Sequence, residues 1–345
     1  MRKLEPRLMA LHIGSMPHTD PAHAVQRVLD AFPDIPAWPQ LPRRSFRENM
    51  YVQFSEGFPG VAVEDEKIYV DRARDLTPEL ERLYTAYIEG DLEFAAVSRE
   101  YALGFYQFIE TVATLPQPPV AVKGQVTGPV SWGLTVTDRD GWSVLYDETL
   151  AEALTKHLGM KAAWQERELR KLSPNTIIFL DEPYMASFGS AYVALGREQA
   201  RMLLEETLIA IQGVRGIHCC GNTDWSLLLE TSVDILSLDA YGYAEALALY
   251  PEEVHAFLDR GGMIAWGIVP TSKDVMQETT ASLVDRLHAA MNLLVRKGIP
   301  FEKVLSASLI TPSCGTGTLS PDLAERVFTL TAEVSAEMRR RYGTE

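Results

Sequence analysis

The sequence predicts a (β/α)8 barrel, or TIM barrel, because short apolar runs alternate with long amphipathic segments along the chain. Several of these runs are almost continuously apolar, as is typical of strands that are buried on both faces of a parallel sheet. The chain has 345 residues, of which 46% are hydrophobic, so it can bury a sizeable core. A doubly wound open sheet is the alternative that this alternation leaves open.

Eight segments have the length and the apolar, β-rich composition expected of strands. They cover residues 8–14, 34–39, 119–124, 176–181, 214–219, 233–239, 262–268 and 303–309. Helices are expected between them, because residues 148–172 and 279–298 carry apolar side chains at helical spacing. Three dipeptides, Asp20-Pro21, Thr77-Pro78 and Ser320-Pro321, place a capping residue before a proline that would start a helix.

Residues 43–76 fit neither pattern, and we expect them to form an insertion over the mouth of the barrel, at its C-terminal face. No linker or low-complexity stretch divides the rest of the chain. The sequence therefore predicts one catalytic barrel domain over residues 1–345.

The charge balance makes nucleic acid and anionic membranes poor partners. The chain carries 47 acidic and 32 basic residues, for a formal net charge of −15. Its first residues do not resemble a signal peptide, and no stretch has the roughly 20 apolar residues that a membrane span needs. Three cysteines, two of them adjacent, argue against a disulfide framework. These features predict a cytoplasmic protein.

Polar residues follow the predicted strands at their C-terminal ends, where barrel enzymes carry their chemistry. They are Gly14-Ser15, Thr127-Gly128-Pro129, Asp181-Glu182-Pro183, His218 to Asn222, Asp239, and Thr311 to Gly315. If the barrel forms, segments far apart in sequence converge on one face.

A metal site is expected within this set. His218 and Cys220 alternate along a strand and share a face, whereas Cys219 points away and is expected to be a core residue. Cys314 would reach the same rim, and Asp239 could complete a tetrahedral set. Thiolates with an imidazole favour zinc. A His-x-Cys pair alone is common by chance, and Asp239 alone would more often be a loop carboxylate, so the convergence carries this prediction.

The charge of this ligand set indicates the chemistry. Two thiolates and a carboxylate outweigh the charge of Zn²⁺, so such a zinc would be a poor source of hydroxide. A substrate thiol held there would still lose its proton and remain nucleophilic. The set therefore favours alkylation of sulfur over hydrolysis.

Five motifs along the chain resemble those of the cobalamin-independent methionine synthase family, in the superfamily that includes uroporphyrinogen decarboxylase and corrinoid-dependent thiol methyltransferases. They are IGSMPHT at 13–19, KGQVTGPV at 123–130, LDEP at 180–183, GIHCCGNTDW at 216–225 and TPSCG at 311–315. The resemblance implies zinc ligands at His218, Cys220, Asp239 and Cys314, although the family normally has Glu where Asp239 stands. It also implies that Ile13, Ser15 and Asp181 bind homocysteine, with Asp181 on its ammonium group.

The departures from the family concern the methyl donor. Folate-dependent members have two barrels, and the glutamate that they place on the folate falls on Ser187 here. Their folate-contacting arginines and their histidine acid have no counterpart, and Arg44 or a neighbour replaces a substrate-binding Glu. The chain resembles the short, single-barrel synthases instead, and HCCGNT resembles a motif of methylcobalamin:thiol methyltransferases. The resemblance thus implies methylcobalamin or a methylated corrinoid protein as donor, and a corrinoid protein as partner.

The sequence predicts a zinc-dependent methyltransferase that makes methionine from homocysteine. Three alternatives stay open: transfer to another thiol such as coenzyme M, a decarboxylase like uroporphyrinogen decarboxylase, and a zinc- or corrinoid-binding delivery protein. Asp181 argues against a sulfonate-bearing thiol, and the metal ligands argue against a decarboxylase that needs no metal.

Overall fold

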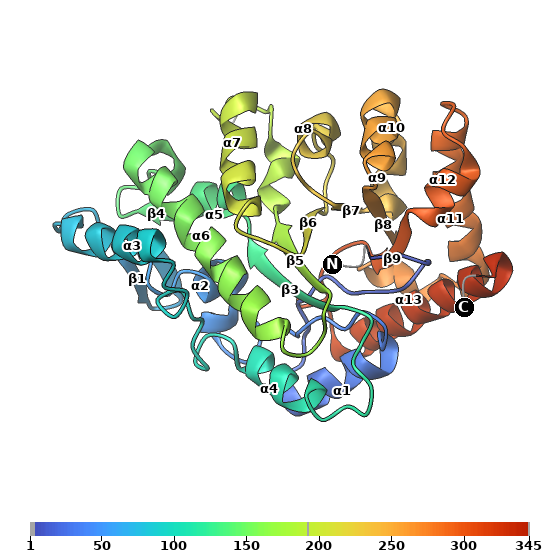
Figure 1. Cartoon of the computed structure of the whole chain (residues 1–345), viewed down its shortest axis with the longest axis horizontal. Helices are drawn as coiled ribbons and strands as arrows, with labels where there is room; N and C mark the ends of the chain where they lie inside the picture. Colours follow the sequence, from blue (N-terminus) through green and yellow to red (C-terminus); the bar gives the residue numbers. More distant parts are fainter. Residues whose placement is uncertain (1–3, 192, 344–345) are drawn as a thin grey trace.

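Six parallel strands form the main sheet of this computed structural model, which describes residues 4–191 and 193–343 (Figure 1). Hydrogen-bonded neighbours follow one another in the order β3-β5-β6-β7-β8-β9. The strands are β3 (Val122–Thr127), β5 (Thr176–Asp181), β6 (Val214–Cys219), β7 (Ile235–Leu238), β8 (Met263–Val269) and β9 (Ser308–Pro312).

Two extended segments near the N-terminus close this sheet into a ring. Isolated parallel bridges pair Ala10 with Ile310 of β9, Ser15 with Gln40, and Ala37 with Lys123 of β3. The order of neighbours therefore passes from β9 through residues 8–14 and 34–40 back to β3. The (β/α)8 barrel that the alternation predicts is confirmed, with helices placed around the strands (Figure 1).

Four predicted strands differ from the structure. Residues 8–14 contain an isolated bridge at Ala10 rather than a regular strand. The bounds of the other three were wrong for identifiable reasons. Residues 34–39 form bridges rather than a regular strand, because Pro36 and Pro39 lack the backbone N–H that a ladder needs. The third strand starts three residues late, after Pro118-Pro119. In the predicted strand 303–309, the first residues instead belong to helix α12 (Phe301–Ser306), so β9 begins at Ser308. A short apolar run suits a buried helical turn as well as a strand.

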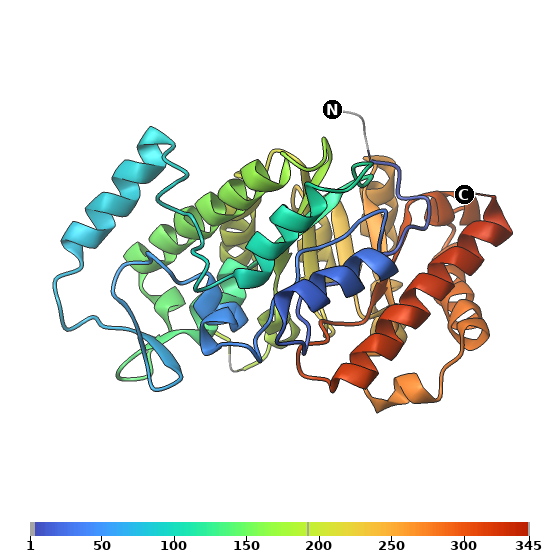
Figure 2. The same cartoon turned by 90° about the horizontal axis from the view of Figure 1, so that it is seen from below.

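Helices connect successive strands and cover the outside of the ring. The two predicted at 148–172 and 279–298 are α6 (Glu148–Leu169) and α11 (Thr280–Val295). The others are α1 (Pro21–Ala31), α2 (Met50–Gln53), α3 (Thr77–Glu89), α4 (Leu103–Val112), α5 (Pro129–Thr135), α7 (Arg197–Leu208), α8 (Trp225–Leu229), α9 (Ala240–Leu247), α10 (Pro251–Asp259) and α13 (Pro321–Tyr342). Helix α13 lies beside α1 and α11 (Figure 2). No helix in the described part of the chain is long and apolar enough to cross a membrane.

The segment 43–76 folds onto the C-terminal end of β3. The Thr127 hydroxyl donates a 2.7 Å hydrogen bond to the Met50 carbonyl, and the Trp132 indole donates to the Tyr51 carbonyl at 2.8 Å. Farther along, β1 (Val61–Glu64) and β2 (Lys67–Val70) form a hairpin, and β2 pairs with β4 (Thr137–Asp138) in a second sheet. The insertion therefore contacts the face where the strands end.

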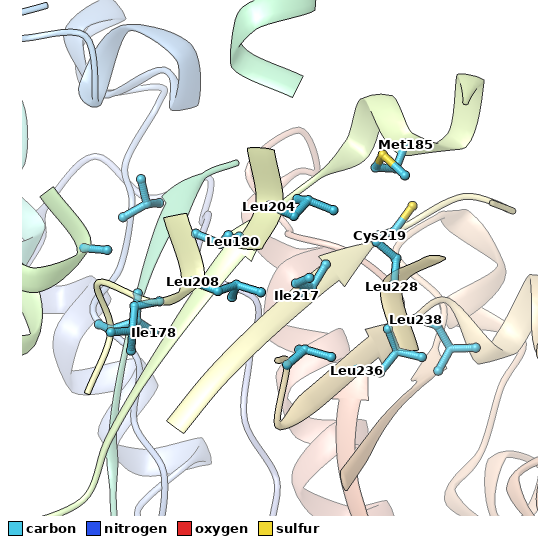
Figure 3. Packing of buried hydrophobic residues seen from close by; sticks show 14 of the residues in the cluster. Ile178, Leu180, Met185, Leu204, Leu208, Ile217, Cys219, Leu228, Leu236 and Leu238 are labelled. Atoms are coloured by element: carbon cyan, nitrogen blue, oxygen red, sulfur yellow. The ribbon is translucent and has the colours of Figure 1, made fainter. Parts of the chain in front are cut away.

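Alternation along the strands divides the core into two clusters. Ile178, Leu180, Ile217, Leu236 and Leu238 point outward, where they pack in one cluster with the helix residues Leu204, Leu208 and Leu228 (Figure 3). Ile177, Phe179 and Ile235 belong to the smaller cluster inside the barrel. The inward series continues at the C-terminal ends of the strands with Asp181, His218 and Ser237, which pair in register across β5, β6 and β7.

Candidate metal centre

His218, Cys220 and Cys314 come together at the C-terminal ends of β6 and β9. One ligand atom from each of the three residues lies within 4.8 Å of the other two, the only such group of three or more His, Cys, Asp and Glu side chains in residues 4–191 and 193–343. The barrel thus brings Cys314 next to a pair that precedes it by almost a hundred residues. This set of one imidazole and two sulfurs matches the preference of zinc.

The imidazole of His218 has one nitrogen engaged and one available. Its Nδ1 lies 3.0 Å from the hydroxyl of Ser237, whereas Nε2 is buried without a hydrogen-bond partner in the described chain. A buried polar atom without a partner is costly and calls for an explanation. Coordination of a metal by Nε2 would satisfy it.

The two thiols interact as a pair. A hydrogen bond between them lowers the pKa of Cys220, which His218 lowers further, and raises the pKa of Cys314, whose burial acts in the same direction. One thiolate beside one thiol is the arrangement expected when two sulfurs share a proton. A divalent ion in place of that proton would hold both as thiolates.

Cys219 belongs to the core, as expected. Its side chain is fully buried and belongs to the same hydrophobic cluster as Met185 and Leu228 (Figure 3). Burial raises the pKa of this thiol to about 12, which keeps it protonated and unreactive.

Asp239 lies close to the three-residue group but outside it. Its side chain caps α9 by accepting a 2.8 Å hydrogen bond from the Gly242 backbone N–H. Burial raises the pKa of Asp239, the nearby Cys220 raises it further, and His218 lowers it. The carboxylate is thus within electrostatic reach of both residues, and its role as fourth ligand stays a prediction.

Asp181 presents a carboxylate with an unused oxygen. Its Oδ1 is buried and has no hydrogen-bond partner among the described residues. Burial raises the pKa of Asp181 to about 6, and the ammonium of Lys123 opposes this increase. Lys123 donates to the Ile13 carbonyl at 2.6 Å and to Gln125 at 3.0 Å. Of the predicted substrate residues, Asp181 is therefore available to a cation, whereas the Ile13 carbonyl already accepts from Lys123.

Ser15 connects the first strand segment to the loop of Cys314. Its carbonyl accepts hydrogen bonds from the backbone N–H and the hydroxyl of Thr316, both at 2.9 Å. A Cβ atom on Gly315 would lie 2.2 Å from the Ser15 hydroxyl, so a larger residue there would have to displace this hydroxyl. Ser15 thus holds the loop that positions Cys314.

Sequence reasoning placed Glu182 among the strand-end polar residues but gave it no role, and it missed Ser237. Glu182 is buried in the LDEP motif, and its carboxylate accepts hydrogen bonds from the backbone of Val130 and Ser131 at the start of α5. Burial raises its pKa to about 7. Ser237, the partner of His218, could have been found by extending the alternation back from Asp239.

No protein-family model and no curated protein match the chain, whereas several solved structures resemble its fold, and two of them are described here. The first is a B12-independent methionine synthase from Shewanella sp. W3-18-1 in complex with selenomethionine. It is 16% identical, with a TM-score of 0.61, over 98% of this chain and 99% of that one. The second is a methyltransferase from Methanosarcina mazei, 13% identical, with a TM-score of 0.58, over 95% and 87% of the two chains. At these identities the likeness establishes the shared fold.

Proposed function

We propose that this protein is a zinc-dependent methyltransferase that transfers a methyl group to the sulfur of homocysteine and forms methionine. The observation that carries the proposal is the group of His218, Cys220 and Cys314, whose ligand atoms lie within 4.8 Å of one another. The Nε2 atom of His218 is buried and has no hydrogen-bond partner among the described residues. Both solved neighbours act, by their descriptions, in methyl transfer or methionine synthesis, which supports the same chemistry here.

The residues present fit zinc. His218 Nε2 and the two sulfurs supply three donors, and Asp239 is the candidate for a fourth. When bound, zinc lowers the pKa of a coordinated thiol, so that a substrate sulfur is a thiolate at neutral pH. No general base is then needed.

An amino acid suits the charged residue beside these ligands. Asp181 has a buried oxygen with no partner inside the described chain, and an ionised carboxylate there would bind the substrate ammonium. The selenomethionine bound to the Shewanella synthase is an amino acid of the type that this reaction would release. A sulfonate-bearing thiol such as coenzyme M would meet the same carboxylate with the wrong charge, so homocysteine is the better acceptor.

The methyl donor is the weaker part of the sequence prediction. Departures from the folate-dependent pattern, such as Ser187, predict a methylcorrinoid donor and a corrinoid protein partner. The description of the first neighbour as B12-independent weighs against that donor. We therefore base the proposal on the thiol acceptor and leave the donor to experiment.

The metal and the reaction are tested together. Wild-type protein expressed with zinc is expected to hold about one zinc per chain, and Cys314→Ala is expected to lose most of it and to form no methionine. Cys219→Ala is the matched control, since it removes a neighbouring thiol that faces the core. Zinc is measured by elemental analysis and methionine by mass spectrometry.

Homocysteine is supplied in this assay with either methylcobalamin or methyltetrahydrofolate. Methionine from methylcobalamin alone would support the corrinoid donor, and methionine from the folate alone would overturn it. If wild-type protein expressed with zinc contains none, the proposed function is contradicted. Zinc retention without turnover from either donor would favour a binding protein.

A further inference from the structure

We infer that Ser237 is a positioning residue for His218, whose Nε2 it holds toward Cys220 and Cys314. This inference rests on the proposed zinc site. It concerns the orientation of one ligand, which neither the sequence motifs nor the solved neighbours assign.

The geometry follows from strand register. His218 on β6 and Ser237 on β7 are paired neighbours in the parallel ladder, and both side chains face the barrel interior. The hydroxyl of Ser237 lies 3.0 Å from His218 Nδ1, and neither residue is more than 2% exposed. Water has little access to replace this contact.

A hydrogen bond at one ring nitrogen decides what the other can do. With the ring proton on Nδ1, that nitrogen donates to Ser237 Oγ, and Nε2 keeps a free lone pair. The described residues offer Nε2 no hydrogen bond, and it is buried. Without Ser237, the imidazole ring of His218 could rotate, or its proton could move to Nε2. Either change would make the Nε2 lone pair unavailable to the metal.

The choice of a hydroxyl also limits the charge of the site. Histidine ligands are often oriented by a carboxylate, which adds a negative charge beside the metal. Serine orients the ring without that charge, in a site that already has Cys220, Cys314 and the nearby Asp239. Ser237 therefore fixes the ligand and leaves the charge of the donor set unchanged.

Ser237→Ala tests this role through metal affinity rather than turnover. We expect zinc to bind about 10- to 100-fold more weakly than to wild type, as is typical when the partner of a histidine ligand is lost. Affinity is measured by competition with a chromophoric chelator. Ser237→Thr restores a hydroxyl and should recover affinity relative to Ala. The visible spectrum of the cobalt-substituted protein should change in Ala and return toward wild type in Thr.

Ser308→Ala is the matched control. Ser308 is a fully buried serine on β9 whose hydroxyl donates to the Val304 carbonyl and accepts from the Trp266 indole. Its loss should lower stability and leave zinc affinity unchanged. If Ser237→Ala binds zinc as wild type does, or no more weakly than Ser308→Ala, the inference fails and the proposed function stands. If wild type itself binds no zinc, both fail.

Discussion

His12 shows how strongly burial changes the properties of a single side chain. Its ring is 1% exposed and stacks on Phe32, with 5.3 Å between ring centroids. Its Nε2–H donates to the Ala37 carbonyl at 3.1 Å. Burial lowers the pKa of His12 to about 3, and the charge of Lys123 adds to this effect. His12 is therefore neutral in the folded protein at all ordinary pH values.

Stability should consequently fall as the pH falls below about 6.5, the pKa of an unperturbed histidine. In the range down to about 3, the unfolded chain binds a proton that folded His12 excludes. This costs up to about 1.4 kcal/mol per pH unit. His12→Gln keeps a donor for Ala37 and removes the titration, so its free energy of unfolding should depend less on pH. Urea unfolding at pH 7 and pH 5 measures this difference. If the free energy of unfolding changes equally with pH in both proteins, the prediction is refuted.

At the scale of elements, the contact between the end of β5 and the start of α5 explains why a glycine precedes α5. The Glu182 carboxylate accepts from the backbone N–H of Val130 at 3.0 Å and of Ser131 at 2.7 Å, so it caps the N-terminus of this helix from a neighbouring strand end. A Cβ atom on Gly128 would lie 2.1 Å from the Glu182 carboxylate oxygen. The helix cap thus depends on a missing side chain.

Gly128→Ala should therefore displace Glu182 and lower the free energy of unfolding by about 2–4 kcal/mol. Gly196→Ala is a closely matched control, since Gly196 precedes α7 with the same φ of −71° and an added Cβ would meet nothing within 4 Å. Denaturant midpoints compare the two variants. Similar losses at both positions would show that the backbone, and not the carboxylate, requires glycine.

For the whole molecule, closure of the ring depends on residues from opposite ends of the chain. The segment around Ala10 pairs with β9, and the Ser335 hydroxyl of α13 donates a buried 2.7 Å hydrogen bond to the Leu8 carbonyl. Helix α13, the last helix of the described chain, thus holds the first segment of the barrel in place. The same closure places Ser15 against the loop of Cys314.

Ser335→Ala should lower the free energy of unfolding by about 1–3 kcal/mol, because the Leu8 carbonyl loses its buried side-chain donor. Ser306→Ala removes a hydroxyl from a more exposed position at the end of α12 and should be nearly neutral. Thermal unfolding of both variants measures the difference. If Ser335→Ala is as stable as Ser306→Ala, this attachment contributes little to closure.

The sequence by itself determined the fold class and pointed to the residues of the candidate metal centre. Alternating apolar runs predict a parallel barrel, and the spacing of His218, Cys219 and Cys220 separates two inward side chains from one core residue. Both features are local, because strand periodicity alone assigns a side chain to one face. The bounds of β9 were missed because a short apolar run suits helix and strand equally well.

Only the tertiary structure decided which distant groups meet. Strand register places Ser237 on His218, and ring closure brings Cys314 and Ser15 to one loop. The tertiary structure also shows that Asp239 caps α9 and that Lys123 donates a hydrogen bond to the Ile13 carbonyl. These contacts depend on the relative shift of strands far apart in sequence, which no local pattern encodes.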